Sequence, residues 1–171
     1  MKRVWKACVI PMLFSATAVL PGCTEEAHEH AAVEQNMAMI RAYVDAMNRG
    51  DASYLDEYFA PTYIYHGPGG DLDLEAFKEF HGRVLSAFPA ATMSIEDIVA
   101  AGDKVVTRWK LHGVQNGEFL GIAPTGREVT ISGIIISRFE RGSVVEEWEE
   151  ANLLGMMQQL GVMTPPANEE L

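Results

Sequence analysis

The body of the chain ends with the stretch Gly142-Ser143-Val144-Val145-Glu146-Glu147-Trp148-Glu149-Glu150-Ala151-Asn152, followed by Leu153-Leu154-Gly155-Met156-Met157-Gln158-Gln159-Leu160-Gly161. The pattern predicts a turn, a strand with several acidic residues and a tryptophan, and then a short amphipathic helix. Acidic groups beside a large aromatic ring suit a pocket for acid/base chemistry, and they equally suit a solvated strand. This stretch, together with the elements that precede it, decides the fold class.

Three helices are predicted ahead of the sheet, because apolar residues recur there every three or four positions. The first is expected over 33–48, the second over 52–59, and the third ends at Pro89, with Asp71 or Asp73 able to cap its start. The buried face of the first helix is expected to consist of Met37, Ile40, Val44 and Met47. The corresponding face of the third consists of Phe77, Phe80, Val84 and Phe88.

After the third helix the pattern changes to a period of two, which is typical of strands. Four sequential strands are predicted over 92–100, 104–115, 128–140 and 142–152, and a short β-prone run precedes them at 63–66. Helices that come before a meandering antiparallel sheet indicate an α+β fold, with three N-terminal helices on one face of the sheet and a short C-terminal helix.

Composition excludes several classes of function. The 171-residue chain has room for one domain, and its formal charge of −11 argues against nucleic acid or an anionic membrane surface as a partner. Both cysteines, Cys8 and Cys23, lie near the start, so the body has no thiol nucleophile and no cysteine-based metal site. No glycine-rich phosphate loop or metal-ligand spacing occurs, and no cofactor is expected.

The first 22 residues have the pattern of an export signal, with Lys2, Arg3 and Lys6 ahead of an apolar stretch over 7–20. Leu20-Pro21-Gly22-Cys23 resembles a bacterial lipobox, which implies cleavage before Cys23 and lipidation of its thiol. The resemblance implies an exported protein with a lipid anchor on the periplasmic side of a bacterial membrane, and Thr24 favours the outer membrane. A plain secretory signal or a retained anchor is the alternative.

Two further motifs resemble a known family. Asn48-Arg49-Gly50-Asp51 and the order of elements resemble the nuclear transport factor 2-like superfamily, and Gly117-Glu118-Phe119-Leu120-Gly121-Ile122-Ala123-Pro124-Thr125-Gly126-Arg127 resembles the signature loop of SnoaL-like polyketide cyclases and ester cyclases. Glu146-Glu147-Trp148, Leu153-Leu154-Gly155 and Gln158-Gln159-Leu160-Gly161 resemble their C-terminal signature. The resemblance implies a cone-shaped fold with a curved sheet and a homodimer as one possible assembly. The superfamily also contains isomerases, dehydratases, hydrolases and non-enzymes.

The resemblance also divides the chain. Residues 1–22 are predicted to be a lipoprotein signal peptide, 23–32 a tether, 33–163 the SnoaL-like domain and 164–171 a disordered tail.

At two positions the sequence departs from the family pattern. In the cyclases an acid four residues after the tryptophan transfers the proton, and the matching residue here is Asn152. A histidine often precedes their signature loop, and the matching residue here is Gln115. An amide forms hydrogen bonds but transfers no proton near neutral pH. Catalysis would therefore depend on other residues.

Side-chain alternation predicts which residues face the interior. If Asn152 points inward as in the family, then Glu146 and Trp148 do so too, and Glu147 and Glu149 face outward. On the long strand, one face is assigned to the pocket, namely Val105, Thr107, Trp109, Leu111 and Gln115. The opposite face is assigned to solvent, namely Arg108, Lys110 and His112.

The expected site follows from these assignments. His66, Glu146 and Asn152 are the candidate catalytic residues, with Glu146 or His66 moving a proton. The candidate substrate-binding residues are Tyr65, Trp109, Gln115, Phe119 and Trp148. For Glu146 a hydrated position at the rim is the alternative, and His81 is expected to reach the pocket or to lie at the edge of the core.

Two functions remain open at this point. The first is a cofactor-independent enzyme that acts on a small, largely apolar carbonyl or ester compound in an enclosed pocket, as a cyclase, isomerase or lyase. The second is a lipid-anchored, non-catalytic binding protein for a small apolar ligand. Both require an apolar cavity, and only the first requires a titratable group inside it.

Overall fold

The computed structural model describes residues 21–164, and the side chains from Ala27 onward. Most of the predicted signal peptide, the side chain of Cys23 and residues 165–171 of the predicted tail lie outside this description. Four helices are present among the described residues, α1 (Pro21–Asn48), α2 (Tyr54–Tyr58), α3 (Leu74–Ala87) and α4 (Leu153–Leu160). Over residues 21–164 no helix combines the length and the apolar character needed to cross a membrane.

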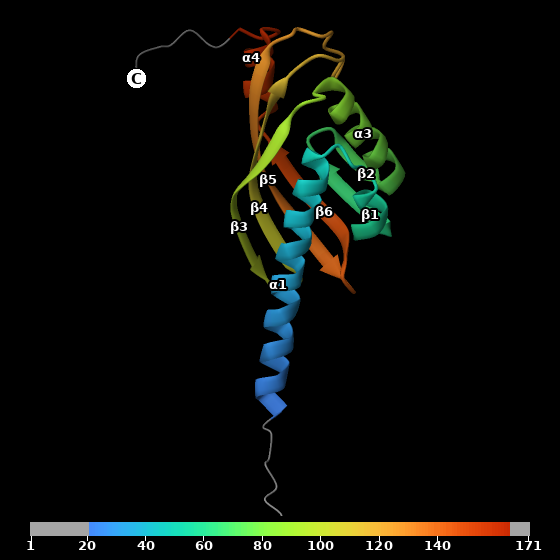
Figure 1. Ribbon diagram of the computed structural model, residues 1–171, viewed down its shortest axis with the longest axis vertical. Helices are drawn as coiled ribbons and strands as arrows, with labels where there is room; N and C mark the ends of the chain where they lie inside the picture. Colours follow the sequence, from blue (N-terminus) through green and yellow to red (C-terminus); the bar gives the residue numbers. More distant parts are fainter. Residues whose placement is uncertain (1–20, 165–171) are drawn as a thin grey trace, which may run out of the picture.

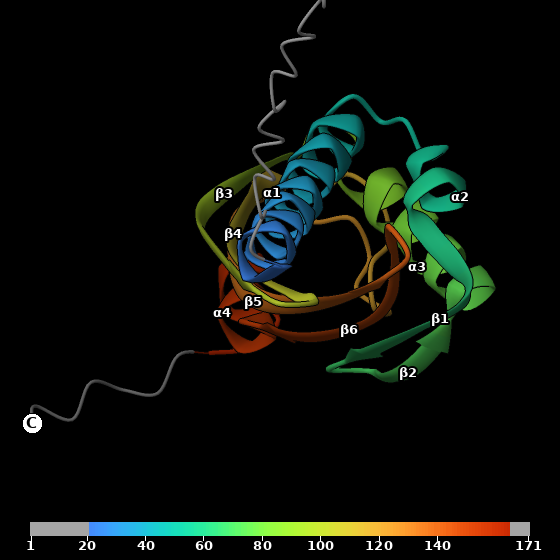
Figure 2. The same cartoon turned by 90° about the horizontal axis from the view of Figure 1, so that it is seen from below.

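Six strands form one sheet, with bounds β1 (Phe59–Gly67), β2 (Gly70–Asp73), β3 (Thr92–Ala101), β4 (Lys104–Val114), β5 (Glu128–Glu140) and β6 (Ser143–Ala151). Their order is β2-β1-β6-β5-β4-β3, and every neighbouring pair is antiparallel except β1 with β6. The sheet curves around α1 and α3, which lie on its concave side (Figures 1 and 2). The predicted α+β fold with a curved, mainly antiparallel sheet is confirmed.

Two elements differ from the prediction. Strand β2 was not expected, because a four-residue strand after a Gly/Pro turn has too little pattern to distinguish it from a helix cap. Helix α1 is already formed at Pro21, the first described residue, rather than from Val33, and its first described part projects beyond the sheet (Figure 1). The added part is rich in alanine and glutamate, both good helix formers. The prediction that residues 23–32 act as a tether stays a prediction.

Strand β6 contains a β-bulge that reverses the expected orientation of its side chains. Phe139 of β5 pairs with Val144 and Arg138 pairs with Glu146, which leaves Val145 without a partner on β5. One extra residue exchanges the two faces of the strand beyond it. Glu147 and Glu149 therefore face the helices. The prediction that Glu146 and Trp148 face the interior is wrong, because it counted alternation back from Asn152, which lies beyond the end of the strand and does not border the cavity.

Strand β4 has no such irregularity. Its pairing with β5 runs without interruption from Lys104 to Val114. Val105, Thr107, Trp109 and Leu111 are all buried, as alternation predicts. On the opposite face Arg108 and Lys110 lie within ion-pair distance of Glu96, and His112 of Glu128. The predicted orientation of β4 is confirmed.

Gly133 on β5 lets the indole of Trp109 lie flat across the sheet. A Cβ atom at this position would lie 2.5 Å from Cζ2 of Trp109 and 2.7 Å from the carbonyl oxygen of Glu150. Both distances are too short for non-bonded atoms, so Trp109 keeps its place only because residue 133 has no side chain. Trp109 thereby extends from β4 across β5 toward β6.

The substitution Gly133→Ala should force the indole away from the sheet. Overpacking of this kind costs about 1–3 kcal/mol, and we expect the free energy of unfolding in urea to fall by that amount. Gly82→Ala is the matched control, because Gly82 is an exposed position in α3 where an added Cβ would have no heavy atom within 4 Å. Alanine there should raise stability by up to about 1 kcal/mol. Equal stability of Gly133→Ala and the wild type would contradict the account.

Candidate functional site

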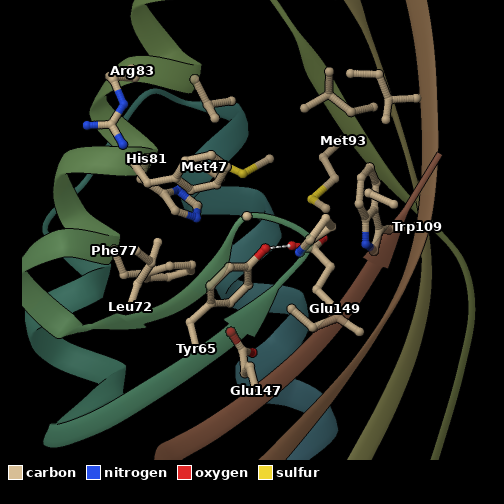
Figure 3. A pocket seen from close by; sticks show the side chains of 18 of the residues that line it. Met47, Tyr65, Leu72, Phe77, His81, Arg83, Met93, Trp109, Glu147 and Glu149 are labelled. Atoms are coloured by element: carbon tan, nitrogen blue, oxygen red, sulfur yellow. Dashed lines mark hydrogen bonds between the residues drawn. The ribbon is translucent and has the colours of Figure 1, made fainter. Parts of the chain in front are cut away.

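A cavity of about 400 Å³ lies between the concave face of the sheet and helices α1 and α3. Its size falls in the range of small-molecule sites. Most of its wall is apolar and includes Ile40, Met47, Phe77, Phe80, Leu111, Phe119 and Ile131. A smaller set of polar side chains borders the same space, and Figure 3 shows several of them pointing toward one another.

Glu147 is the most deeply buried carboxyl group at the cavity, with 1% of its surface exposed. The hydroxyl of Tyr63 on β1 donates a hydrogen bond to its Oε2 at 2.6 Å, and Ser137 on β5 donates to its Oε1 at 2.5 Å. Both carboxyl oxygens are therefore occupied. Burial raises the pKa of Glu147 to about 7 despite these two donors, because the charged form loses its hydration.

Glu149 lies two residues further along the same face of β6. The Tyr65 hydroxyl donates a hydrogen bond to its Oε2, drawn as a dashed line in Figure 3. Burial raises the pKa of Glu149, and the nearby Tyr65 hydroxyl and Trp109 indole partly oppose this rise. No side chain among residues 27–164 occupies its second oxygen, Oε1, with a hydrogen bond of ordinary geometry. Glu149 is thus the carboxyl group available to a ligand.

Two polar groups on the neighbouring wall lack partners. The indole nitrogen of Trp109 and the hydroxyl of Thr107 are buried, and neither forms a hydrogen bond of ordinary geometry within the described part of the chain. The Trp109 indole lies close enough to Glu149 to lower the pKa of that carboxyl group, although the contact misses hydrogen-bond geometry. Buried polar groups normally have partners, so these two are suited to meet a ligand.

A third polar group borders the cavity on the side of α1 and α3. The hydroxyl of Tyr43 lies 3.3 Å from Nε2 of His81, and the hydroxyl of Tyr54 lies 2.9 Å from its Nδ1. Burial lowers the pKa of His81 to about 4, so the imidazole is neutral at physiological pH. Figure 3 shows His81 on α3, across the cavity from Trp109 and Glu149.

Three of the predicted binding residues border the cavity. Tyr65, Trp109 and Phe119 all contribute to its wall. Phe119 is carried by the loop over 116–126, whose start is held against α3 by hydrogen bonds from the backbone of Asn116 and Gly117 to the carbonyl oxygen of Ala87. That these three residues bind substrate stays a prediction.

His66, Glu146 and Trp148 meet on the outer face of the sheet, away from the cavity. His66 lies between two carboxyl groups, with Nδ1 2.8 Å from Asp71 and Nε2 3.1 Å from Glu146. Its ring stacks on Trp148 with centroids 5.6 Å apart. The carboxylate partners, Asp71 first and then Glu146, raise the pKa of His66. This cluster joins β2, β1 and β6 on the convex side.

Gln115 and Asn152 have structural partners that account for their amides. Gln115 donates to the carbonyl oxygen of Ile122 and accepts from the backbone and hydroxyl of Thr125, so it holds the 116–126 loop. Asn152 is the N-cap of α4 and accepts a hydrogen bond from the backbone N–H of Gly155 at 2.9 Å. Asn152 does not border the cavity. The prediction that it points inward is wrong, because the strand ends at Ala151 and the cap orients the side chain along the helix.

The sequence prediction missed Glu147, Glu149 and Tyr43. Both faces of β6 carry two glutamates, so neither face is marked as buried by its composition. Alternation was counted back from Asn152, which does not border the cavity, and it therefore assigned the wrong pair.

Comparison with known proteins agrees with this geometry. The sequence model of the SnoaL-like polyketide cyclase family matches residues 37–160. The chain belongs to this family. Its SnoaL-like domain is similar to aklanonic acid methyl ester cyclase AcmA of Streptomyces galilaeus, with 29% identity over 143 residues that cover 78% of this chain and 95% of that protein.

Solved structures show the same architecture as the SnoaL-like domain. AclR from Streptomyces galilaeus has 27% identity and a TM-score of 0.72, with 77% of this chain and 98% of that chain covered. TsrD from Streptomyces laurentii has 30% identity and a TM-score of 0.70, with 76% and 97% covered. The curved sheet with helices on its concave face is therefore the nuclear transport factor 2-like fold that the motifs implied.

The raised pKa of Glu147 predicts a pH dependence of stability. A carboxyl group that binds its proton more tightly when folded stabilises the fold fully below its unfolded pKa, near 4.5, and this stability is lost as the pH rises to about 7. The loss is on the order of 3 kcal/mol. We expect Glu147→Gln to gain stability relative to the wild type between pH 5 and pH 8, as measured by urea unfolding.

The exposed glutamate Glu150 on the same strand supplies the control. Glu150→Gln should change the free energy of unfolding by the same amount at both pH values. If the free energies of unfolding of Glu147→Gln and the wild type differed by a constant amount from pH 5 to pH 8, Glu147 would not be desolvated in the folded protein.

Proposed function

We propose that the SnoaL-like domain is an enzyme that moves a proton on a small, largely apolar carbonyl or ester compound, without a cofactor, and that Glu149 takes and returns this proton. One observation carries the proposal: a carboxyl group borders an apolar cavity of small-molecule size, and one of its oxygens has no hydrogen-bond partner among residues 27–164. A group of this kind in a cavity is what acid/base catalysis requires.

The surroundings of Glu149 favour its use as a base. A carboxylate that has lost its hydration binds a proton more tightly than one in water, and burial raises the pKa of Glu149 in this way. The hydrogen bond from Tyr65 to Oε2 fixes the orientation of the carboxyl group, and no described side chain forms a hydrogen bond of ordinary geometry with Oε1. A base fixed in this way needs little reorganisation when the substrate arrives.

Glu147 contributes by its charge rather than by contact with substrate. Its two oxygens already accept hydrogen bonds from Tyr63 and Ser137. The charge of Glu149 adds to the burial that raises the pKa of Glu147.

The proposed step is removal of a proton from the carbon beside a carbonyl group. The resulting enolate can attack a second carbonyl group in the same molecule and close a ring, or it can be reprotonated elsewhere. The relative AcmA is named as a cyclase of aklanonic acid methyl ester. By analogy we propose an enolisable ketone or ester as substrate, with Glu149 doing the work that an acid at position 152 does in the family.

A non-catalytic binding protein with a lipid anchor is the second candidate. The amides at Gln115 and Asn152 favour it, because both stand where the family pattern has groups that transfer protons, and both serve the fold here. In this case the cavity would bind a small apolar ligand without changing it.

The two candidates can be separated by hydrogen–deuterium exchange at the carbon between the two carbonyl groups of a panel of aryl β-keto esters, followed by NMR in D₂O. We expect the wild type to accelerate exchange for at least one member of the panel. Glu149→Gln should lower that rate about a hundredfold or more, as expected for loss of a general base. The rate should rise with pH through the raised pKa of Glu149, since the base must be ionised.

Glu146→Gln is the matched control, because Glu146 lies on the same strand and faces away from the cavity. Its exchange rate should equal that of the wild type. If Glu149→Gln had the same exchange rate as the wild type, Glu149 would be excluded as the base. Tight binding of the panel with no exchange above the buffer rate would favour the binding protein.

A further inference from the structure

The cavity wall opposite Glu149 includes a hydrogen-bonded series of three side chains that have no role in the proton transfer proposed above. Tyr43 on α1 and His81 on α3 border the cavity, and Tyr54 lies behind them with 2% of its surface exposed. The contacts run from the Tyr54 hydroxyl to Nδ1 of His81 at 2.9 Å and from Nε2 to the Tyr43 hydroxyl at 3.3 Å.

The position of each proton in this chain follows from burial. The Tyr54 hydroxyl has no acceptor other than Nδ1 of His81 among the residues that the structure describes. A buried O–H group without an acceptor costs about 1–3 kcal/mol, so Tyr54 donates its proton to Nδ1. The imidazole is neutral and carries one proton, which must then reside on Nε2. Nε2 therefore donates to the oxygen of Tyr43.

Tyr43 is left with a hydroxyl proton that no described residue accepts. Its oxygen receives the N–H of His81. The Tyr43 hydroxyl lies close enough to Tyr54 to oppose the rise in the pKa of Tyr54, although this contact misses hydrogen-bond geometry. Burial, and then the neighbouring Tyr54, Glu147 and Glu149, raise the pKa of Tyr43, so the hydroxyl stays protonated. The effect of the two glutamates also means that Tyr43 is close to the acid pair.

We infer that the Tyr43 hydroxyl is the hydrogen-bond donor for the carbonyl oxygen of the substrate, held opposite Glu149. The inference rests on the proposed function and specifies its substrate class: a ketone or ester whose oxygen accepts from Tyr43 while the adjacent C–H group faces Oε1 of Glu149. A hydrocarbon of the same shape would leave the Tyr43 proton unpaired and would bind less tightly.

The chain also stabilises the charge that the reaction creates. When the C–H bond breaks, its proton passes to the carboxylate of Glu149, and its electron pair moves to the carbonyl oxygen, which becomes an enolate. Tyr54, His81 and Tyr43 all donate in the same direction, and hydrogen bonds in such a chain strengthen one another. Tyr43 keeps its proton throughout, and the step returns along the same path.

Binding of two matched probes tests the inference without turnover. 2-Acetylnaphthalene and 2-isopropenylnaphthalene have the same shape, and only the first has an acceptor oxygen. Their dissociation constants can be measured by displacement of the fluorescent probe N-phenyl-1-naphthylamine. The wild type should prefer the ketone, and Tyr43→Phe should lower this preference about two- to tenfold. Tyr58→Phe changes a tyrosine outside the cavity wall and should leave the preference for the ketone unchanged.

A second measurement does not depend on any variant. Nitrogen-15 NMR of the histidines should show His81 as a neutral ring with its proton on Nε2. A proton on Nδ1, or an unchanged preference in folded Tyr43→Phe, would overturn the inference. This test can fail independently of the proposed function. The preference for the ketone probe can depend on Tyr43 even if the exchange rate does not depend on Glu149. The exchange rate can likewise depend on Glu149 even if the probe preference does not depend on Tyr43.

Discussion

Val145 is the one residue of β6 between Ser143 and Ala151 that has no partner on β5, and the arrangement of the cavity depends on it. Before it, a two-residue turn at Arg141 and Gly142, both with positive φ, sets the pairing of β5 with β6. After it, every side chain has changed face, so Glu147 and Glu149 point toward the helices. If Val145 instead paired with Arg138 in a regular ladder, Glu146 and the indole of Trp148 would face the helices in their place.

The acid pair is tolerated in an apolar cavity because hydroxyl groups on other strands meet it. Tyr63 and Ser137 donate to Glu147, and Tyr65 donates to Glu149, so the two neighbouring strands β1 and β5 offset the cost of removing two carboxyl groups from water. The same hydrogen bonds leave one oxygen of Glu149 without a partner among the side chains that the structure describes. Stability and the proposed chemistry therefore depend on the same contacts, and the chain Tyr54–His81–Tyr43 completes the cavity on its other wall.

Much of this fold could be predicted from the sequence because its strands are long and regular. The bounds of β5 were predicted without error, and the alternation of β4 placed Thr107 and Trp109 on the correct face. The site was harder, because neither face of β6 is distinctly apolar and alternation was counted from Asn152, which caps α4 instead of bordering the cavity. The sequence did contain a signal for the role of Asn152, because an asparagine just before an amphipathic helix is a good N-cap. The family pattern, which places this position in the pocket, was given more weight.

The most direct test of this account is a carbon-13 NMR titration of the glutamate carboxyl groups in the full domain. The account predicts that two of them titrate above the ordinary range, with Glu147 near pH 7, and that Glu147→Gln and Glu149→Gln each remove one of these signals. Glu146→Gln should leave both in place. Titration of Glu147 and Glu149 in the ordinary range of exposed glutamates would contradict the claim that the bulge at Val145 buries this acid pair in the cavity.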